Sequence, residues 1–111
     1  MIHETRVGEV LIVHPTQPRL DAYEAESFKD HMGQRIRAGH VQLILDLSRV
    51  EFIDSSGLGA IVASLKMLGG NGSLRLCGIR ETILSLFKLT RMDRVFPIFA
   101  TQEEALTSLS T

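Results

Sequence analysis

The chain has 111 residues, a length that predicts one domain, over residues 1–111, with a single hydrophobic core. Its formal net charge is −1, and basic and acidic residues are interspersed, which excludes the basic surface typical of nucleic-acid-binding proteins. With five Phe, one Tyr and no Trp, the chain is also poor in the aromatic residues on which bases stack. We therefore expect no direct nucleic-acid partner.

Cysteine and histidine usage gives no sign of a metal site. Cys77 is the one cysteine, so no internal disulfide can form, and it is expected to be a small buried apolar side chain. The four histidines are scattered without ligand spacing: His3, His14, His31 and His40. We expect neither a metal nor another cofactor.

No segment predicts export or membrane insertion. Residues 1–6 lack the apolar core of a signal peptide. The most apolar run, residues 58–68, is interrupted by Ser64 and Lys66 and is shorter than the ~20 residues of a membrane span. The expectation is a soluble cytoplasmic protein without a membrane partner.

The first half of the chain alternates strands with a helix. Residues 1–7 and 9–13 predict two strands joined by a turn at Gly8, and the prolines in residues 14–18 predict a loop. Asp21 followed by Glu24 has the form of a capping box. Apolar residues then recur at helical spacing up to Gly39: Ala25, Phe28, Met32 and Ile36. The very apolar residues 41–47 predict a central strand.

The second half continues the alternation. Residues 58–68 predict the body of a helix, with one apolar stripe and one face of small residues that another element could approach closely. The stripe contains Leu58, Ile61, Val62, Leu65 and Leu68, and the second face contains Ala60, Ala63, Ser64 and Met67. Residues 69–72, Gly-Gly-Asn-Gly, superficially resemble a phosphate-binding loop. They follow a helix and lack the Lys-Ser/Thr ending, so they predict a helix stop.

Three more elements complete the pattern. Residues 73–77 predict a strand, residues 80–89 a helix, and residues 95–98 a short edge strand. The buried side chains of the helix are expected to be Ile83, Leu86 and Phe87. A capping box at residues 101–104 opens a last helix, which is expected to bury Ala105, Leu106 and Leu109. Strands that alternate with helices predict a mixed α/β sheet with right-handed crossovers.

The most informative stretch is residues 52–59, Phe-Ile-Asp-Ser-Ser-Gly-Leu-Gly. It predicts the end of a strand, a short turn, and a helix whose first turn carries Ser55 and Ser56 beside Asp54. The first N–H groups of a helix have no intrahelical partner and favour negative charge, so a phosphate is tolerated there. The simplest alternative is that one serine is only the N-cap of the helix.

These residues resemble a known family. The sequence from Asp54 to Gly59, Leu-Asp-Leu-Ser at residues 45–48, Gly69-Gly70 and the order of elements are similar to STAS domains, in particular bacterial anti-sigma factor antagonists. The resemblance implies a single STAS-type α/β domain. Its mixed sheet would have about five strands, with about four helices mainly on one side.

The resemblance also implies the functional residues. In anti-sigma factor antagonists the serine directly after the aspartate accepts the phosphate, which corresponds to Ser55, with Ser56 as a neighbour. Asp54 is expected to cap the helix, or to orient the acceptor hydroxyl and contact the partner. Gly57 and Gly59 would allow close backbone approach, and the alternative is that they are only turn-forming glycines. Leu58 would be a core residue of its helix by its periodicity, or a partner contact.

A second partner-binding position is Asp21. Residues 18–21, Pro-Arg-Leu-Asp, occupy the place of the Gly-x-Leu-Asp loop that contributes to partner contact in this family. Pro18 replaces the glycine, and the alternative is that Asp21 only caps its helix. Asp46, late in a buried strand, is expected to bind backbone donors and not to act in catalysis.

The function implied by the resemblance is partner switching, without enzymatic activity. The unmodified protein would bind an anti-sigma factor that is also a serine kinase, and a serine phosphatase would restore this form after phosphorylation. A second hypothesis is a STAS scaffold subunit of a larger signalling or transport assembly. A third is a nucleotide-binding or hydrolytic enzyme, although the chain has no Gly-x-Ser-x-Gly motif.

Overall fold

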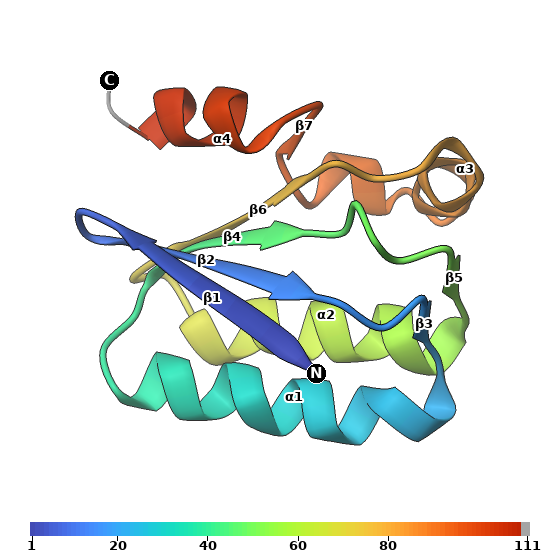
Figure 1. Ribbon diagram of the computed structural model, residues 1–111, viewed down its shortest axis with the longest axis horizontal. Coiled ribbons are helices and arrows are strands. Elements are labelled where there is room, and N and C mark those ends of the chain that lie inside the picture. Colours follow the sequence, from blue (N-terminus) through green and yellow to red (C-terminus); the bar gives the residue numbers. More distant parts are fainter. Residues whose placement is uncertain (110–111) are drawn as a thin grey trace.

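A five-stranded mixed sheet forms the centre of the computed structural model, which describes residues 1–109 (Figure 1). The strand order is β1-β2-β4-β6-β7, and only β1 is antiparallel to its neighbour. The strands are β1 (Ile2–Val7), β2 (Val10–Pro15), β4 (Gln42–Asp46), β6 (Ser73–Cys77) and β7 (Ile98–Phe99). The mixed sheet of about five strands is therefore confirmed.

The predicted loop at residues 14–18 is wrong at its start, because β2 continues to Pro15. Pro15 is the last residue of the strand and lies opposite Ile2. The N–H of Thr16, the next residue, donates to the carbonyl of Met1 (3.0 Å). The strand thus tolerates a residue without an N–H at this position.

Four α-helices surround the sheet. Figure 1 shows α1 (Ala22–Arg37) and α2 (Ser55–Leu68) side by side under one face and α4 (Gln102–Leu109) on the other. Helix α3 (Glu81–Leu89) lies at the end of the sheet near β5 (Phe52–Ile53), and a short 3-10 helix, η1 (Met92–Arg94), follows it. None of the helices in residues 1–109 is long and apolar enough to cross a membrane.

Alternation along the strands divides the core into two parts. The larger part lies under α1, α2 and α3 and includes Leu11, Val13, Leu43, Leu45, Leu74, Leu76, Ile83 and Phe87. The smaller part lies under α4 and consists of Ile12, Ile44, Cys77 and Ala105. Three of the four helices therefore contribute to one core, as expected from helices mainly on one side.

The small-residue face of α2 packs against α1, the element that lies beside it. Ala60 and Ser64 are buried, and the Ser64 hydroxyl donates to the carbonyl of Ala60 (2.9 Å). A Cβ atom added at Gly33 of α1 would lie 3.3 Å from the sulfur of Met67. The predicted close approach is thus made within the fold.

The predicted strand at residues 95–98 is wrong over most of its length. The chain forms η1 and then turns, so that only residues 98–99 pair with β6. Phe96 faces the core and contacts Phe87 edge to face, with ring centroids 6.3 Å apart. Burial of this aromatic ring outweighs the local β propensity of the segment.

The last helix begins close to the predicted capping box. The N–H of Glu104 donates to the Thr101 hydroxyl (3.1 Å), as expected. The carboxylate of Glu104 accepts from the N–H of Ala100 (3.1 Å), one residue before the predicted donor.

Candidate functional site

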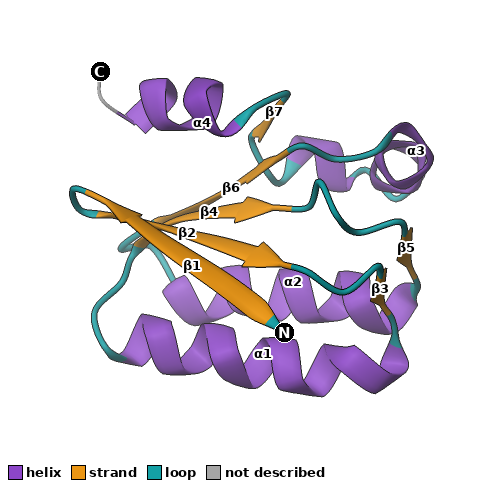
Figure 2. Cartoon of the chain, viewed as in Figure 1, coloured by secondary structure: helices purple, strands orange, loops and turns teal. Residues whose placement is uncertain are grey.

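A second, two-stranded sheet brings together the two loops that the sequence singles out (Figure 2). Strand β3 (Arg19–Leu20) runs parallel to β5, with Arg19 opposite Phe52 and Leu20 opposite Ile53. The carbonyl of Pro18 accepts from the N–H groups of Glu51 (2.7 Å) and Phe52 (3.1 Å). Neither strand is long enough to show a periodic pattern, so the sequence does not indicate their pairing.

Asp21 is the N-cap of α1, as predicted. Its Oδ1 accepts from the N–H of Tyr23 (3.1 Å), and its Oδ2 accepts from Nε of Arg19 (3.0 Å). The hydrogen bond from Arg19 lowers the pKa of the Asp21 carboxyl, and the backbone donors of the cap act in the same direction. The capping bond reaches the second residue of the helix and not Glu24, the third, so the predicted box is only partly formed.

Asp54 is the N-cap of α2, which is one of its two predicted roles. Its Oδ1 accepts from the N–H of Gly57 (2.9 Å), and its Oδ2 accepts from the N–H of Ala22 (3.2 Å), the first residue of α1. The alternative that a serine caps this helix is wrong, because Asp54 occupies that position and Ser55 is the first helical residue. One carboxylate thus serves the starts of both helices.

Gly57 allows the close backbone approach that is expected of a glycine at this position. A Cβ atom at this position would lie 2.0 Å from the carbonyl oxygen of Leu20, far inside contact distance. The same expectation is wrong for Gly59, because a Cβ atom there would meet open space. Leu58 is half-buried against the larger core, in line with its periodicity.

Ser55 and Ser56 are both exposed in the first turn of α2. Neither hydroxyl makes a hydrogen bond to another residue of the described range 1–109, since Asp54 already caps the helix. The positive end of the helix dipole lies at this turn. The arrangement offers two free nucleophilic oxygens at a place that accepts added negative charge.

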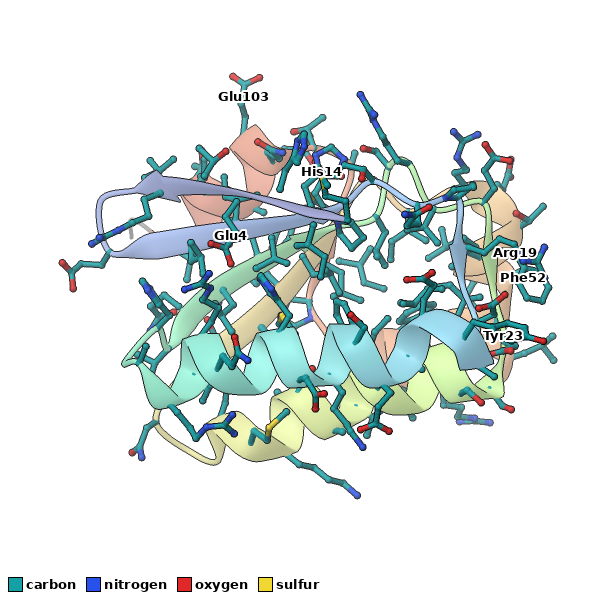
Figure 3. The ribbon with its side chains drawn as sticks, turned by 60° about the horizontal axis from the view of Figure 1, so that its bottom comes forward. Glu4, His14, Arg19, Tyr23, Phe52 and Glu103 are labelled. Carbon is teal, nitrogen blue, oxygen red and sulfur yellow. The ribbon has the colours of Figure 1, made fainter. Side chains whose placement is uncertain are left out.

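Aromatic side chains flank the two caps and are further members of the candidate site that were not predicted from the sequence. The guanidinium of Arg19 lies over the Phe52 ring, 4.2 Å from its centroid, and Tyr23 is 92% exposed. Figure 3 shows Arg19, Phe52 and Tyr23 together at one end of the molecule. Phe52 lies two residues before Asp54, and Tyr23 lies two residues after Asp21. This closeness in sequence to the two predicted aspartates is the feature that could have indicated both aromatic residues.

Asp46 has the structural role that was expected. Its carboxylate accepts from the N–H of Ser48 (2.9 Å) and from the amide of Gln102 on α4 (2.6 Å). Burial by itself would raise the pKa of Asp46, but these donors outweigh it and the pKa is lowered.

Two further expectations concern metals and the cysteine. No group of three His, Cys, Asp or Glu residues within residues 1–109 could hold a metal ion. Cys77 is buried, and burial together with the nearby Asp46 charge raises the pKa of its thiol to about 12.

Comparison with known proteins gives a consistent result. The STAS domain family model matches residues 2–105. The anti-sigma F factor antagonist of Paenibacillus polymyxa is 28% identical over 102 residues, which are 90% of this chain and 86% of the relative. The crystal structure of a provisionally named anti-sigma factor antagonist from Thermotoga maritima has a TM-score of 0.93 at 30% identity, covering 99% of this chain and 95% of that one.

A more distant neighbour shares the fold alone. The Bacillus cell fate determinant SpoIIAA, solved in its phosphorylated form, has a TM-score of 0.76 at 22% identity, covering 98% of this chain and 99% of that one.

Proposed function

This chain belongs to the STAS domain family, and on that premise we propose that it is an anti-sigma factor antagonist that works by partner switching. In the unmodified form it binds an anti-sigma factor that is also a serine kinase, and the sigma factor is released. Phosphorylation of Ser55 ends this complex. The observation that carries the proposal is the exposed Ser55 hydroxyl, which makes no hydrogen bond to residues 1–109, on the first turn of a helix whose cap is made by another residue.

A phosphate on Ser55 is compatible with the fold. The hydroxyl takes part in no capping bond, so its modification leaves the bonds from Gly57 and Ala22 to Asp54 intact. The phosphate adds about −1.5 to −2 charges at the positive end of the helix dipole, which tolerates them. The adjacent Asp54 carboxylate repels the phosphate, so the added charge points toward solvent and away from the cap.

The same phosphate is incompatible with a buried interface. The partner-binding surface is formed by Arg19, Tyr23, Phe52 and the first turn of α2, which includes Ser55. Aromatic and arginine side chains are the residue types that most often dominate the affinity of such surfaces. A dianion at the edge of these side chains must be desolvated when the complex forms, and a few kcal/mol of this cost lowers the affinity by orders of magnitude.

The protein would thus be a ligand and a substrate, not an enzyme. The anti-sigma factor kinase transfers the phosphate from ATP in the cytoplasm, and a serine phosphatase regenerates the binding form. Asp21 and Asp54 support this cycle by holding the two loops, and Ser56 and the half-buried Leu58 extend the contact surface on α2. Gly57 is buried and supports this surface from within, through its close approach to Leu20.

The test begins with the proteins that co-purify with the unmodified chain, identified by mass spectrometry. The purified kinase partner and ATP are incubated with the chain and with matched Ser55→Ala and Ser56→Ala variants. We expect phosphate on the wild type and on Ser56→Ala but not on Ser55→Ala, with Ser55→Ala still binding the partner. Ser55→Asp should weaken binding by tenfold or more.

Two results would contradict the proposal. Phosphate on Ser56 alone would contradict the assignment of Ser55. A large, stable assembly on size-exclusion chromatography, with Ser55 never modified, would favour a scaffold subunit of a signalling or transport complex instead.

A further inference from the structure

A polar pocket lies at the opposite end of α2 from Ser55, and it has no part in the proposed function. Its volume is about 370 Å³, and it is lined by Gln42 on β4, the loop of residues 70–72, Ser73 and Arg75 on β6, and Ser108 and Leu109 at the end of α4. Helix α2 has 14 residues, so at about 1.5 Å per residue the pocket is roughly 20 Å from Ser55. Figure 1 shows the separation: α2 starts beside β5 and ends at the loop that leads into β6.

Arg75 distinguishes this pocket from the rest of the surface. Most Lys and Arg residues of the described chain are exposed, and the partly buried Lys29 and Arg35 form ion pairs with Glu26 and Glu4. Arg75 is also partly buried, yet within residues 1–109 no carboxylate lies within ion-pair distance of it.

Hydroxyl groups hold the guanidinium in place without neutralising it. Nε of Arg75 donates to the hydroxyl of Ser108 (2.8 Å), and Nη1 donates to the hydroxyl of Ser73 (2.5 Å). The Ser108 hydroxyl donates in turn to the carbonyl of Ala105 (2.7 Å), and the Ser73 hydroxyl donates to Oε1 of Gln42 (2.6 Å). The orientation of Arg75 is thus fixed from two sides, while no residue of the range 1–109 neutralises its charge.

Other donors border the same space. Oε1 of Gln42 accepts from Ser73, so the NH₂ group of this amide is left as a donor. The backbone N–H groups of Gly70 and Gly72 donate to no carbonyl among the described residues. A half-buried, fixed guanidinium surrounded by further donors is the arrangement that recognises an oxyanion.

From these observations we propose that the pocket binds the phosphate group of a small phosphate monoester. A tetrahedral phosphate has oxygens for the guanidinium, the amide and the loop N–H groups together, whereas a planar carboxylate has only two. The volume lies within the range of small-molecule sites and leaves room for an organic substituent beyond the phosphate.

The test is a titration of the full chain with inorganic phosphate, followed by ¹H–¹⁵N NMR at constant ionic strength. We expect saturable shifts of the amides of residues 70–73 and of the Arg75 Nε signal. Arg75→Gln should weaken binding at least tenfold, and Arg75→Lys, which keeps the charge without the planar fork, should weaken it less. Arg6→Gln, the same change at an exposed arginine of β1, should leave binding unaltered.

Several results would overturn the proposal. The proposal is wrong if phosphate causes no saturable chemical-shift changes, or if these changes are confined to residues 55–57. It is also wrong if Arg75→Gln binds phosphate as well as the wild type does. Acetate that binds as tightly as phosphate would overturn the assignment to phosphate. If the Arg75→Gln spectrum shows that this variant is unfolded, Arg75→Lys decides: undiminished phosphate binding overturns the proposal, and weakened binding with a native spectrum supports it.

Discussion

Asp54 accepts a hydrogen bond from the backbone N–H of Ala22, 32 positions earlier in the sequence (Oδ2–N 3.2 Å). Its other oxygen caps α2 through the N–H of Gly57. Two helices that begin in different loops are therefore joined through a single carboxylate.

Replacing this carboxylate should destabilise both helix starts. We expect Asp54→Ala to lower the free energy of unfolding by about 1–2 kcal/mol, the usual cost of losing an N-cap, with the lost bond to Ala22 favouring the upper end. Asp54→Asn should cost less, because its amide oxygen can still accept one of the two bonds. Urea denaturation measures both values. Asp30→Ala replaces an exposed residue of α1 whose side chain makes no hydrogen bond to residues 1–109, so it should change stability by less than about 0.5 kcal/mol.

Two glycines of the same helix should respond to alanine with opposite signs. Gly57→Ala forces a Cβ atom against the carbonyl oxygen of Leu20, and we expect a loss of at least about 2 kcal/mol. Gly59→Ala meets open space within a helix, where alanine is favoured over glycine by about 0.5–1 kcal/mol, so this variant should be more stable than the wild type. Thermal unfolding distinguishes the two signs directly. Equal effects at both positions would contradict the contact between α2 and β3.

Asp46 should make stability depend on acid pH. Its pKa in the folded protein is lower than the ordinary value of 3.8, so the charged form is the one that folding favours. Its contribution is complete above the unfolded-state pKa and is lost as the pH falls through the lower folded-state pKa. We expect Asp46→Asn to cost about 1–3 kcal/mol at pH 7 and to flatten this acid dependence.

Urea denaturation between pH 7 and pH 2 measures the effect. Asp30→Asn, the control at an exposed carboxylate, should retain the wild-type slope. If the free energy of unfolding of Asp46→Asn falls with pH as steeply as that of the wild type, the role assigned to this carboxylate is refuted.

Cys77 should be unreactive in the folded protein. A pKa of about 12 leaves roughly one thiol in ten thousand ionised at pH 8, and the side chain is also shielded from solvent. We expect no reaction with a disulfide reagent over minutes in buffer and complete reaction in denaturant, followed by the absorbance of the released thiolate. Fast labelling of the native protein would mean that α4 opens readily from the sheet.

Tyr23 should matter for binding and not for stability. With 92% of its surface exposed, Tyr23→Ala should change the free energy of unfolding by less than about 0.5 kcal/mol. If the proposed partner surface is correct, the same variant should lose tenfold or more in affinity for the anti-sigma factor, measured by calorimetry. Leu89→Ala, an 82% exposed residue at the end of α3, is the matched control and should bind normally.

The caps and long helices could be predicted from the sequence because their signals are local. Asp21 and Asp54 precede apolar residues at helical spacing, and both are N-caps in the structure. The sheet followed from alternating elements. The sequence left open whether Asp54 or a serine caps α2, and in the structure Asp54 is the cap.

What could not be predicted depends on contacts between distant residues. The pairing of β3 with β5 joins segments more than 30 positions apart and has no pattern within either strand. The contact of Arg19 with Phe52 depends on that pairing. The segment around Phe96 was predicted as a strand from its composition, whereas its conformation is set by the burial of one ring against Phe87.

Gly57 packs so closely against the Leu20 carbonyl that the loop before α1 and the loop before α2 are in direct backbone contact. Any molecule that recognises this end of the protein therefore meets a rigid epitope assembled from two separate stretches of chain. A short synthetic peptide with the sequence of residues 52–59 would contain only one of these two stretches and would not hold its conformation. It would therefore be a poor mimic of the native surface.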